Sequence, residues 1–313
     1  MSTTQILASS RVRPYGERGA ADVADWAAKA QAYGGFVALP WPQTGLEQAA
    51  VALAAQGLPL VGVQLPLPPE PLPSGRRVPH WASLDDAEER LAAINMANET
   101  LARAQTFGCT WAFLDAFSIK LKAPSKLFAQ SYGERRWDRD RSSKVAARPL
   151  LEAALVERKE HDQRLCDAAR HSLERLANVA EARGVRVAVG HGIGPWQFPS
   201  PREVDLLLEE FRGGPLVKAH VPARLDVLET IGLLTADRRT ALALAPFVLA
   251  SDAVGLRDDL APGLGPTPLT TKLLQAAGKP PDVVVVSGRA DTQPQELAAA
   301  VTRMKRLAAL SLP

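Results

Sequence analysis

The feature that most constrains the fold is a regular alternation of short apolar runs with longer segments of helical periodicity. The clearest runs are Leu60–Leu65, Arg186–Val189 and Val283–Val286, which are rich in β-branched residues. Short, continuously apolar runs of this kind are typical of parallel strands that are covered on both faces. Glycine or proline follows most of the helical segments and marks where each helix is expected to end. The sequence therefore predicts an α/β protein with a parallel sheet.

Eight such strand–helix units can be counted along the chain. The expected strands are 6–8, 36–39, 60–65, 110–114, 186–189, 216–220, 247–251 and 283–286. The expected helices are 20–33, 46–56, 83–107, 146–183 with one break, 201–211, 224–231, 236–244, 269–277 and 294–310. Eight units in 313 residues predict a (β/α)8 TIM barrel that forms a single domain over 1–313, with a long loop on the active-site side at about 118–145.

A doubly wound open sheet is the alternative architecture. That fold usually carries a GxGxxG phosphate-binding motif after its first strand, and no such motif follows residues 6–8. Gly190, Gly192 and Gly194 are spaced GxGxG after the fifth expected strand, which is a weak signal for a dinucleotide site. The barrel is the better interpretation.

Composition excludes several classes of function. A net charge of +3 is nearly balanced and does not predict a nucleic-acid-binding surface. The chain has no apolar stretch long enough to cross a membrane and no secretion signal at its first residues, so we expect a cytoplasmic protein with no membrane partner. Cys109 and Cys166 are far apart and lack metal-binding or redox spacing. Association with another copy of the chain or with a protein partner stays open.

The carboxyl ends of barrel strands meet at one mouth, where TIM-barrel sites are built. Polar residues at the expected strand ends are therefore the candidate site. The candidate catalytic residues are His191, His220, Asp252 and Asp115. The candidate substrate-binding residues are Arg224, Arg257, Asp258, Gln64 and Arg289.

Each candidate also has a structural interpretation. His191 stands between two glycines at a strand end, where a ligand-facing ring and an ordinary loop histidine are equally consistent with the sequence. Asp252 and Asp258 lie in a glycine-rich segment, where aspartates often accept hydrogen bonds from backbone N–H groups. Arg224 is expected either to hold an anion or to form an ion pair, for example with Asp252.

Two segments resemble the xylose isomerase-like barrel superfamily, which includes sugar phosphate isomerases and epimerases and the endonuclease IV group. The segment ASDAVGLRDDLAPGLG (250–265) is similar to the family pattern HxHDxxGxxDHxxPGxG after strand seven. The segment KAHVPARLDVLETIGL (218–233) resembles the family pattern WHDxGHAxxxxxLG after strand six. The order of elements extends the resemblance over almost the whole chain.

The resemblance implies a divalent metal held by carboxylates and histidines at the mouth, with paired glutamates that move a proton beside a carbonyl. This sequence departs from that pattern at most of the ligand positions. The family's ligand or catalytic positions fall on Gly190, Val221, Arg224, Ala250, Ser251, Asp259 and Ser287. Because glycine, valine, alanine and serine side chains do not replace carboxylate and imidazole ligands, we expect a degenerate site and no bound metal. A rearranged site that uses His191, His220 and Asp252, with or without Asp115, is the alternative.

Three functions follow from this interpretation. The first is a protein that acts on or binds a small polar carbonyl or polyol compound without the usual metal, using His191, His220, Asp115 or Asp252 for acid–base chemistry. The second is a barrel that has lost turnover and serves as a ligand-binding or partner protein. The third, a nuclease related to endonuclease IV, needs a metal cluster and a basic surface that the sequence does not suggest.

Overall fold

We analysed a computed structural model of the chain. It describes residues 4–73, 76–84, 86–119, 121, 141–234, 245–254, 257–265, 267 and 280–310, and of residues 141–147, 254, 257 and 310 it describes the backbone only. The expected helices at 236–244 and 269–277, and most of the expected loop at 118–145, lie outside the described residues.

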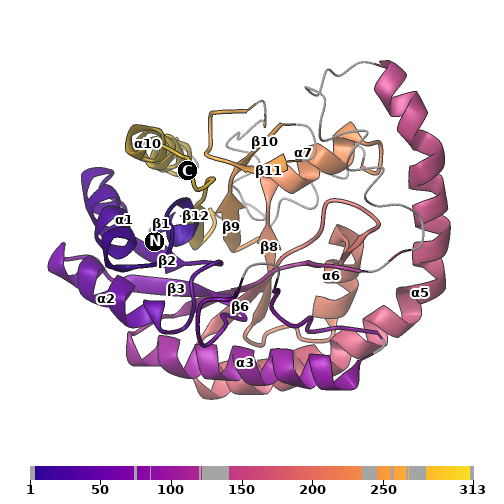
Figure 1. Cartoon of the computed structure of the whole chain (residues 1–313), viewed down its shortest axis with the longest axis horizontal. Coiled ribbons are helices and arrows are strands. Elements are labelled where there is room, and N and C mark those ends of the chain that lie inside the picture. The colour runs from indigo at the N-terminus through magenta and orange to yellow at the C-terminus, as the bar shows by residue number, and fades with distance from the viewer. Residues whose placement is uncertain are drawn as a thin grey trace.

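A closed parallel barrel forms the centre of the molecule (Figure 1). Its strands follow the order β1-β12-β9-β8-β6-β4-β3-β2, and all pairings between neighbours are parallel. This confirms the predicted TIM barrel and excludes the open sheet. The barrel strands are β1 (Gln5–Ser9), β2 (Gly34–Val37), β3 (Leu60–Leu65), β4 (Trp111–Leu114), β6 (Arg186–Val189), β8 (Leu216–His220), β9 (Phe247–Ala250) and β12 (Val283–Val286).

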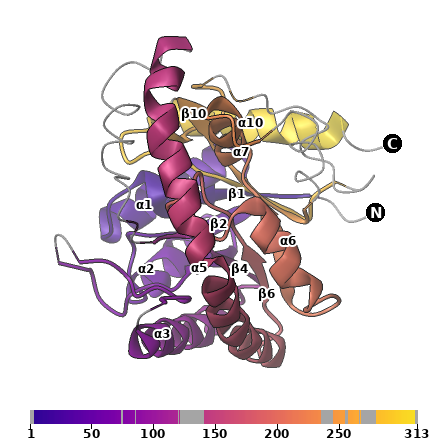
Figure 2. The same ribbon diagram turned by 90° about the vertical axis from the view of Figure 1, so that its right-hand side faces the viewer.

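Helices surround the strands, as Figures 1 and 2 show. They are α1 (Glu17–Lys29), α2 (Gly45–Ala55), α3 (Ala87–Thr106), α5 (Arg141–Ala182), α6 (Pro201–Glu209), α7 (Pro222–Thr230) and α10 (Pro294–Leu310). The expected break in 146–183 is wrong, because α5 runs through Pro149 as one helix. It also starts earlier than expected, inside the segment 118–145. None of the described helices is long and apolar enough to cross a membrane.

Large aromatic side chains fill the inside of the barrel. Phe247 contacts Phe36, Trp111 and Phe113, with ring centroids 5.6–6.2 Å apart, and its ring is stacked on that of Phe113. These rings belong to a buried cluster that takes alternate residues of the strands, as expected when side chains point alternately inward and outward. The barrel is therefore a packed core, and only its ends are open to a ligand.

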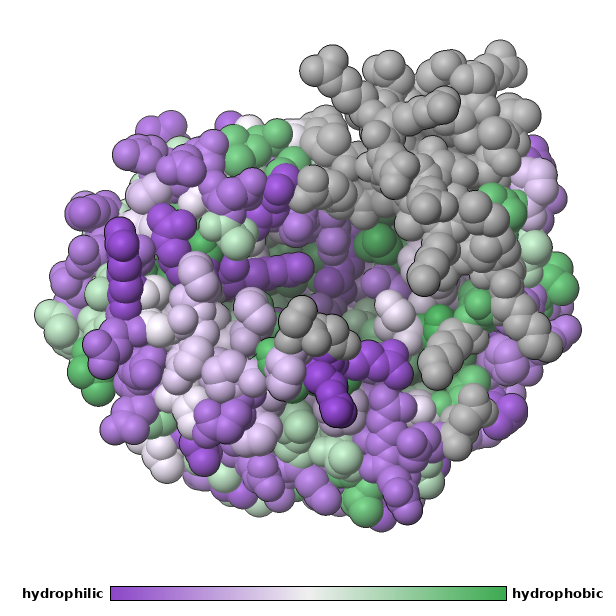
Figure 3. All heavy atoms as spheres, in the orientation of Figure 1, coloured by the Kyte–Doolittle hydropathy of each residue, from purple (hydrophilic) through white to green (hydrophobic). Residues whose placement is uncertain are grey.

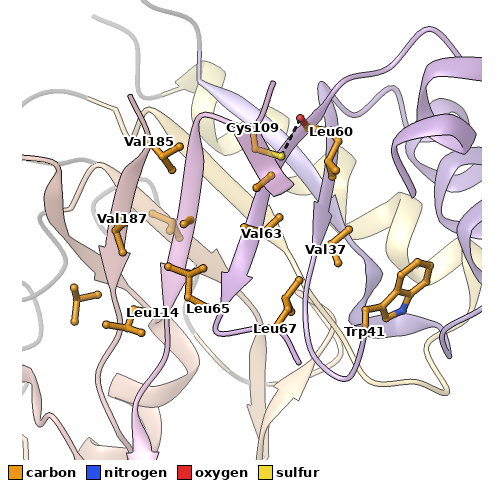
Figure 4. Close-up of a cluster of buried hydrophobic side chains, with 14 of the residues drawn as sticks. Val37, Trp41, Leu60, Val63, Leu65, Leu67, Cys109, Leu114, Val185 and Val187 are labelled. Carbon is orange, nitrogen blue, oxygen red and sulfur yellow. Dashed lines mark hydrogen bonds between the residues drawn. The ribbon is translucent and has the colours of Figure 1, made fainter. Parts of the chain in front are cut away.

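A second apolar layer lies between the strands and the surrounding helices. Figure 4 shows part of it, where Val63 and Leu65 of β3 lie near Leu114 of β4 and Val187 of β6. Cys109 belongs to this layer, and its thiol donates to the carbonyl of Leu60 at 3.6 Å. Burial raises the pKa of this thiol to about 12, so Cys109 is a packing residue.

Two small antiparallel sheets were not expected from the sequence. β5 (Phe117–Ser118), which follows β4, pairs with β7 (Gln197–Phe198), which follows β6. β10 (Asp252–Val254) pairs with β11 (Arg257–Leu260) just after β9. Both sheets come from loops that follow the carboxyl ends of barrel strands. They therefore bring Asp258 and the segment after His191 to the mouth.

Candidate functional site

Arg224 is the centre of the polar group at the mouth. It lies in the first turn of α7, directly after β8, and is only 7% exposed. Its guanidinium forms a bidentate pair with Asp115, at 2.5 Å from Nη1 to Oδ1 and 3.1 Å from Nη2 to Oδ2. Nε donates to Asp258 Oδ2 at 2.7 Å, and Nη1 also donates to the carbonyl of His191 at 2.7 Å. Arg224 thus joins the ends of β4, β6 and β8 to the β10–β11 sheet.

The electrostatics of this cluster keep Arg224 and Asp258 charged. Burial by itself would raise the pKa of Asp258, but the charge and hydrogen bonds of Arg224 lower it below its ordinary value. Burial would likewise lower the pKa of Arg224, and Asp115 and Asp258 raise it instead. A carboxylate held ionised by a buried guanidinium is a weak proton acceptor at neutral pH. The cluster is therefore suited to holding structure and shape more than to moving protons.

Gln64 extends the cluster to the neighbouring strand. It lies near the end of β3, where its Nε2 donates to Asp115 Oδ2 at 3.4 Å and its Oε1 accepts from the N–H of Leu39 at 3.1 Å. The structure thus brings together four of the predicted site residues, Asp115, Gln64, Arg224 and Asp258. The expected pairing of Arg224 with Asp252 is wrong, because Asp115 and Asp258 take that place.

His191 lies beside this cluster and is 2% exposed. Its Nδ1 is 3.1 Å from the carbonyl of Gly192, and since a carbonyl only accepts, Nδ1 carries the proton. Nε2 is then an acceptor, and it has no hydrogen-bond partner in the described part of the chain. Burial lowers the pKa of His191 to about 4; the Gly192 bond opposes this shift, and the charges of Arg224 and Lys218 add to it. The ring is therefore neutral at pH 7.

His220 does not join the mouth cluster. Ala219 and Val221 beside it belong to the inner aromatic cluster, so strand alternation turns His220 to the outer face of β8. Its register partner on β9 is Val248, which lies in the layer beneath the helices. The geometry gives no support to a catalytic role for His220. The position of His220 at a strand end does not reveal this orientation, because the face on which a side chain lies depends on its place in the inward–outward alternation of the strand.

Asp252 is fully buried and holds the loop that follows β9. Its Oδ2 accepts from the N–H groups of Gly263 and Gly265 at 2.9 and 2.8 Å. Its Oδ1 accepts from those of Thr267 and Ala253 at 2.8 and 3.0 Å. With four backbone donors on one carboxylate, the geometry favours the structural interpretation of Asp252 over the catalytic one.

The two remaining predicted binding residues lie apart from the cluster. Arg289 pairs with Asp291 at 2.9 Å and is partly exposed. Arg257 begins β11, but its side chain lies outside the described residues. The role of both in substrate binding stays a prediction.

At two of the metal-ligand positions that the sequence resemblance identifies, Gly190 and Arg224, an aromatic ring and a guanidinium lie where metal ligands are expected. A Cβ at Gly190, where a glutamate is expected, would lie 2.7 Å from the Phe113 ring and 3.4 Å from Asp115 Oδ1. Phe113 thus fills the space that a side chain at this position would need. Arg224 places a cation between the two carboxylates nearest to it, Asp115 and Asp258. Across the described residues, no three or more His, Cys, Asp or Glu side chains gather as metal ligands. The donors at the described part of the mouth therefore do not fit a divalent ion.

Three serines at the mouth form a row that we did not predict. Ser9 ends β1, Ser287 directly follows β12, and Ser251 directly follows β9. The register pairs Ala8 with Val286 and Val286 with Ala250, so the next residues, Ser9, Ser287 and Ser251, lie side by side. Counting inward positions along each expected strand would have found this row.

A cavity of about 590 Å³ opens beside the mouth. It lies among α5, α6, the end of α7 and the loop after β6, and its lining includes Arg158, Glu203, Leu228 and Gly192. Those candidate site residues whose side chains the structure describes are not part of its lining.

In the space-filling view the visible face is hollowed near its middle, with many hydrophilic residues around the hollow (Figure 3).

Solved structures match this architecture over almost the whole chain. An L-ribulose 3-epimerase gives a TM-score of 0.63 at 12% identity, covering 98% of this chain and 97% of that one. A 3-keto-D-glucoside 4-epimerase from E. coli gives 0.62 at 13% identity, covering 97% and 99%. A xylose isomerase domain protein from Alicyclobacillus acidocaldarius subsp. acidocaldarius gives 0.57 at 14% identity, covering 99% of both. The chain has a xylose isomerase-like TIM-barrel fold.

Comparisons at the level of sequence do not add to this. No protein-family model matches the chain, and no curated protein sequence matches it. The resemblance predicted from the two motif segments is thus confirmed as a fold. At 12–14% identity, the activities named for these structural neighbours belong to those proteins.

Proposed function

We propose that this chain binds a small polar carbonyl or polyol compound at the mouth of its barrel, and that it does so without a divalent metal. The observation that carries the proposal is the position of Arg224. Its guanidinium is bonded to Asp115 and Asp258, the two carboxylates that would otherwise be nearest to a bound cation. A metal ion there would have to displace a buried cation that makes four hydrogen bonds.

The proposed function is ligand binding and does not include catalytic turnover. Isomerisation and epimerisation beside a carbonyl need a group that takes a proton and a group that returns it. Asp258 is held ionised by Arg224, and the carboxylate of Asp252 is taken up by backbone N–H groups. The structural neighbours named as sugar epimerases support a polar, sugar-like ligand by analogy of fold. A ligand-binding barrel is the function that best fits these residues.

Metal analysis and ligand titration test the proposal together. We expect the purified, untagged chain to hold substoichiometric divalent metal by mass spectrometry. Added Mn²⁺ or Mg²⁺ should leave its melting temperature unchanged, whereas a neutral ketose or polyol such as D-fructose or D-sorbitol should raise it. One tightly bound divalent ion per chain, together with ketose epimerisation that a chelator abolishes, would overturn the proposal.

A second candidate function has one observation in its favour. His191 has a neutral ring with an acceptor Nε2 that lacks a partner among the described residues, as a general base requires. Metal-independent proton transfer would then give turnover that survives a chelator and is lost in His191→Gln. The exposed His171 offers a matched control, since His171→Gln should keep full turnover. Turnover that His191→Gln leaves intact would exclude this candidate.

A further inference from the structure

We propose that Ser9, Ser287 and Ser251 form a hydroxyl row that binds a neutral polyhydroxylated ligand directly. The inference rests on the proposed function, because it names the residues and the ligand class of the same site. Two of the three positions, Ser251 and Ser287, are places where the resembling family has metal-binding or catalytic side chains. In this chain, hydroxyl groups take their place.

The register of the barrel points the three hydroxyls in one direction. Ser9 pairs with Phe36, which lies in the inner aromatic cluster. Leu249 and Val285 pair with each other in the same cluster, and Ser251 and Ser287 are the next inward positions on their strands. The N–H of Ser287 donates to the carbonyl of Ala250 at 3.0 Å, so the parallel ladder continues to this level. Neighbouring members of the row are therefore about 5 Å apart, the spacing of adjacent strands.

The hydroxyl of Ser251 is available to bond to a ligand at this row. Its side chain is 3% exposed, and its Oγ has no hydrogen-bond partner among the described residues. A buried hydroxyl is rarely left without a partner, because an unmade hydrogen bond is costly. Ser9 is only partly engaged, since its Oγ accepts from the N–H of Arg11 at 3.3 Å and can still donate. The row thus offers donors and acceptors toward the mouth.

The charges around the mouth favour a neutral ligand over a phosphorylated one. Asp115, Asp258 and the His191 carbonyl accept from four of the five N–H groups of Arg224, and Arg289 pairs with Asp291. The order of strands places β12, with Ser287 after it, four strands from β4 and Asp115 in either direction around the barrel. The row therefore faces a side of the mouth that carries two carboxylates. A neutral ligand can bond to the serine hydroxyls without a cation, whereas a phosphate is bound best where a free cation meets it.

Calorimetric titration with D-fructose and D-sorbitol tests the row in Ser251→Ala and Ser287→Ala. We expect the Kd to rise about three- to tenfold in each variant, the range for one lost hydrogen bond. The melting temperature of ligand-free Ser251→Ala should equal or exceed that of the wild type, because the Ser251 hydroxyl makes no hydrogen bond within the described residues. Ser10→Ala is the matched control. Ser10 Oγ accepts from the N–H of Ala38 at 3.0 Å, so this variant should melt lower and keep its Kd.

Each possible result has a definite meaning. Unchanged Kd values in both row variants, with D-fructose still bound, would overturn the row and leave the proposed function standing; Ser251 would then hold only ordered water. D-fructose 6-phosphate binding more than tenfold tighter than D-fructose would overturn the neutral ligand class. A wild-type chain that binds neither D-fructose nor D-sorbitol would overturn the proposed function and the row with it.

Discussion

The two sides of the barrel mouth differ in how their polar groups are used. On one side Arg224, Asp115, Asp258 and Gln64 bond to one another, and the guanidinium makes four hydrogen bonds inside the protein. On the other side the serine row includes Ser251, whose buried hydroxyl has no partner among the described residues. We refer to them as the charged side and the hydroxyl side.

This difference separates stability from recognition within one site. A buried ion pair whose charged groups bond mainly to one another holds the loops of the mouth together and leaves little for a ligand. An unpartnered hydroxyl contributes little to the folded state and is available for a ligand. The charged side should therefore respond to mutation through stability, and the hydroxyl side through affinity.

The largest effect is expected on the charged side, from Arg224→Met. Removing the guanidinium leaves Asp115 and Asp258 buried without their counter-charge, which should lower the free energy of unfolding by about 3–5 kcal/mol. Arg212→Met is the matched control, because Arg212 is exposed and pairs with the exposed Glu209. It should cost less than about 1 kcal/mol. Denaturant unfolding monitored by circular dichroism measures both variants.

A double variant separates the charge effect from lost packing. Adding Asp115→Asn to Arg224→Met removes one of the stranded charges, so the double variant should be more stable than Arg224→Met alone. If Arg224→Met were no more destabilising than Arg212→Met, the charged side would not be the structural cluster described above.

The next effect is a pH dependence carried by His191. Burial lowers its pKa in the folded chain to about 4, below the ordinary value of 6.5. Between these values the unfolded chain binds the proton and the folded chain does not, so stability should fall as the pH drops from 6.5 to 4. The shift corresponds to roughly 2–4 kcal/mol over that window.

His191→Asn should remove most of this slope, because the asparagine amide can still donate to the Gly192 carbonyl and does not titrate there. Exposed His171→Asn is the control and should keep the wild-type slope. Unfolding by urea at a series of pH values gives both slopes. Equal slopes in the wild type and His191→Asn would show that another group carries the dependence.

The barrel could be predicted because each of its strands has a signal in its own short stretch of sequence. β3, β6, β8, β12 and α10 have the predicted bounds, since an apolar run bounded by glycine or proline needs no distant partner to be recognised. The β10–β11 and β5–β7 sheets were missed because two- to four-residue strands in loops have no periodicity to detect. The expected break in 146–183 was wrong, since α5 continues through Pro149 without one.

The site was predicted as a set of strand-end residues, and only part of that set meets. Asp115, Gln64, Arg224 and Asp258 come together, whereas His220 is turned outward by its register and Asp252 is used by backbone N–H groups. Side-chain direction and competition for hydrogen bonds are properties of the folded chain. Strand ends alone therefore identified the mouth but not the division of its residues between the two sides.

The smallest effect is expected from Arg289→Ala, which sharpens what the hydroxyl side recognises. Arg289 lies two residues after Ser287 and pairs with Asp291, whose side chain is 68% exposed. Loss of this exposed pair should change the free energy of unfolding by less than about 1 kcal/mol. Since a neutral ligand on the serine row needs no cation, the Kd for D-fructose should stay within about twofold of the wild type. Calorimetry on Arg289→Ala and Ser287→Ala in parallel measures this affinity. A tenfold loss of affinity in Arg289→Ala would instead make Arg289 a binding residue and give the hydroxyl side a charged contact.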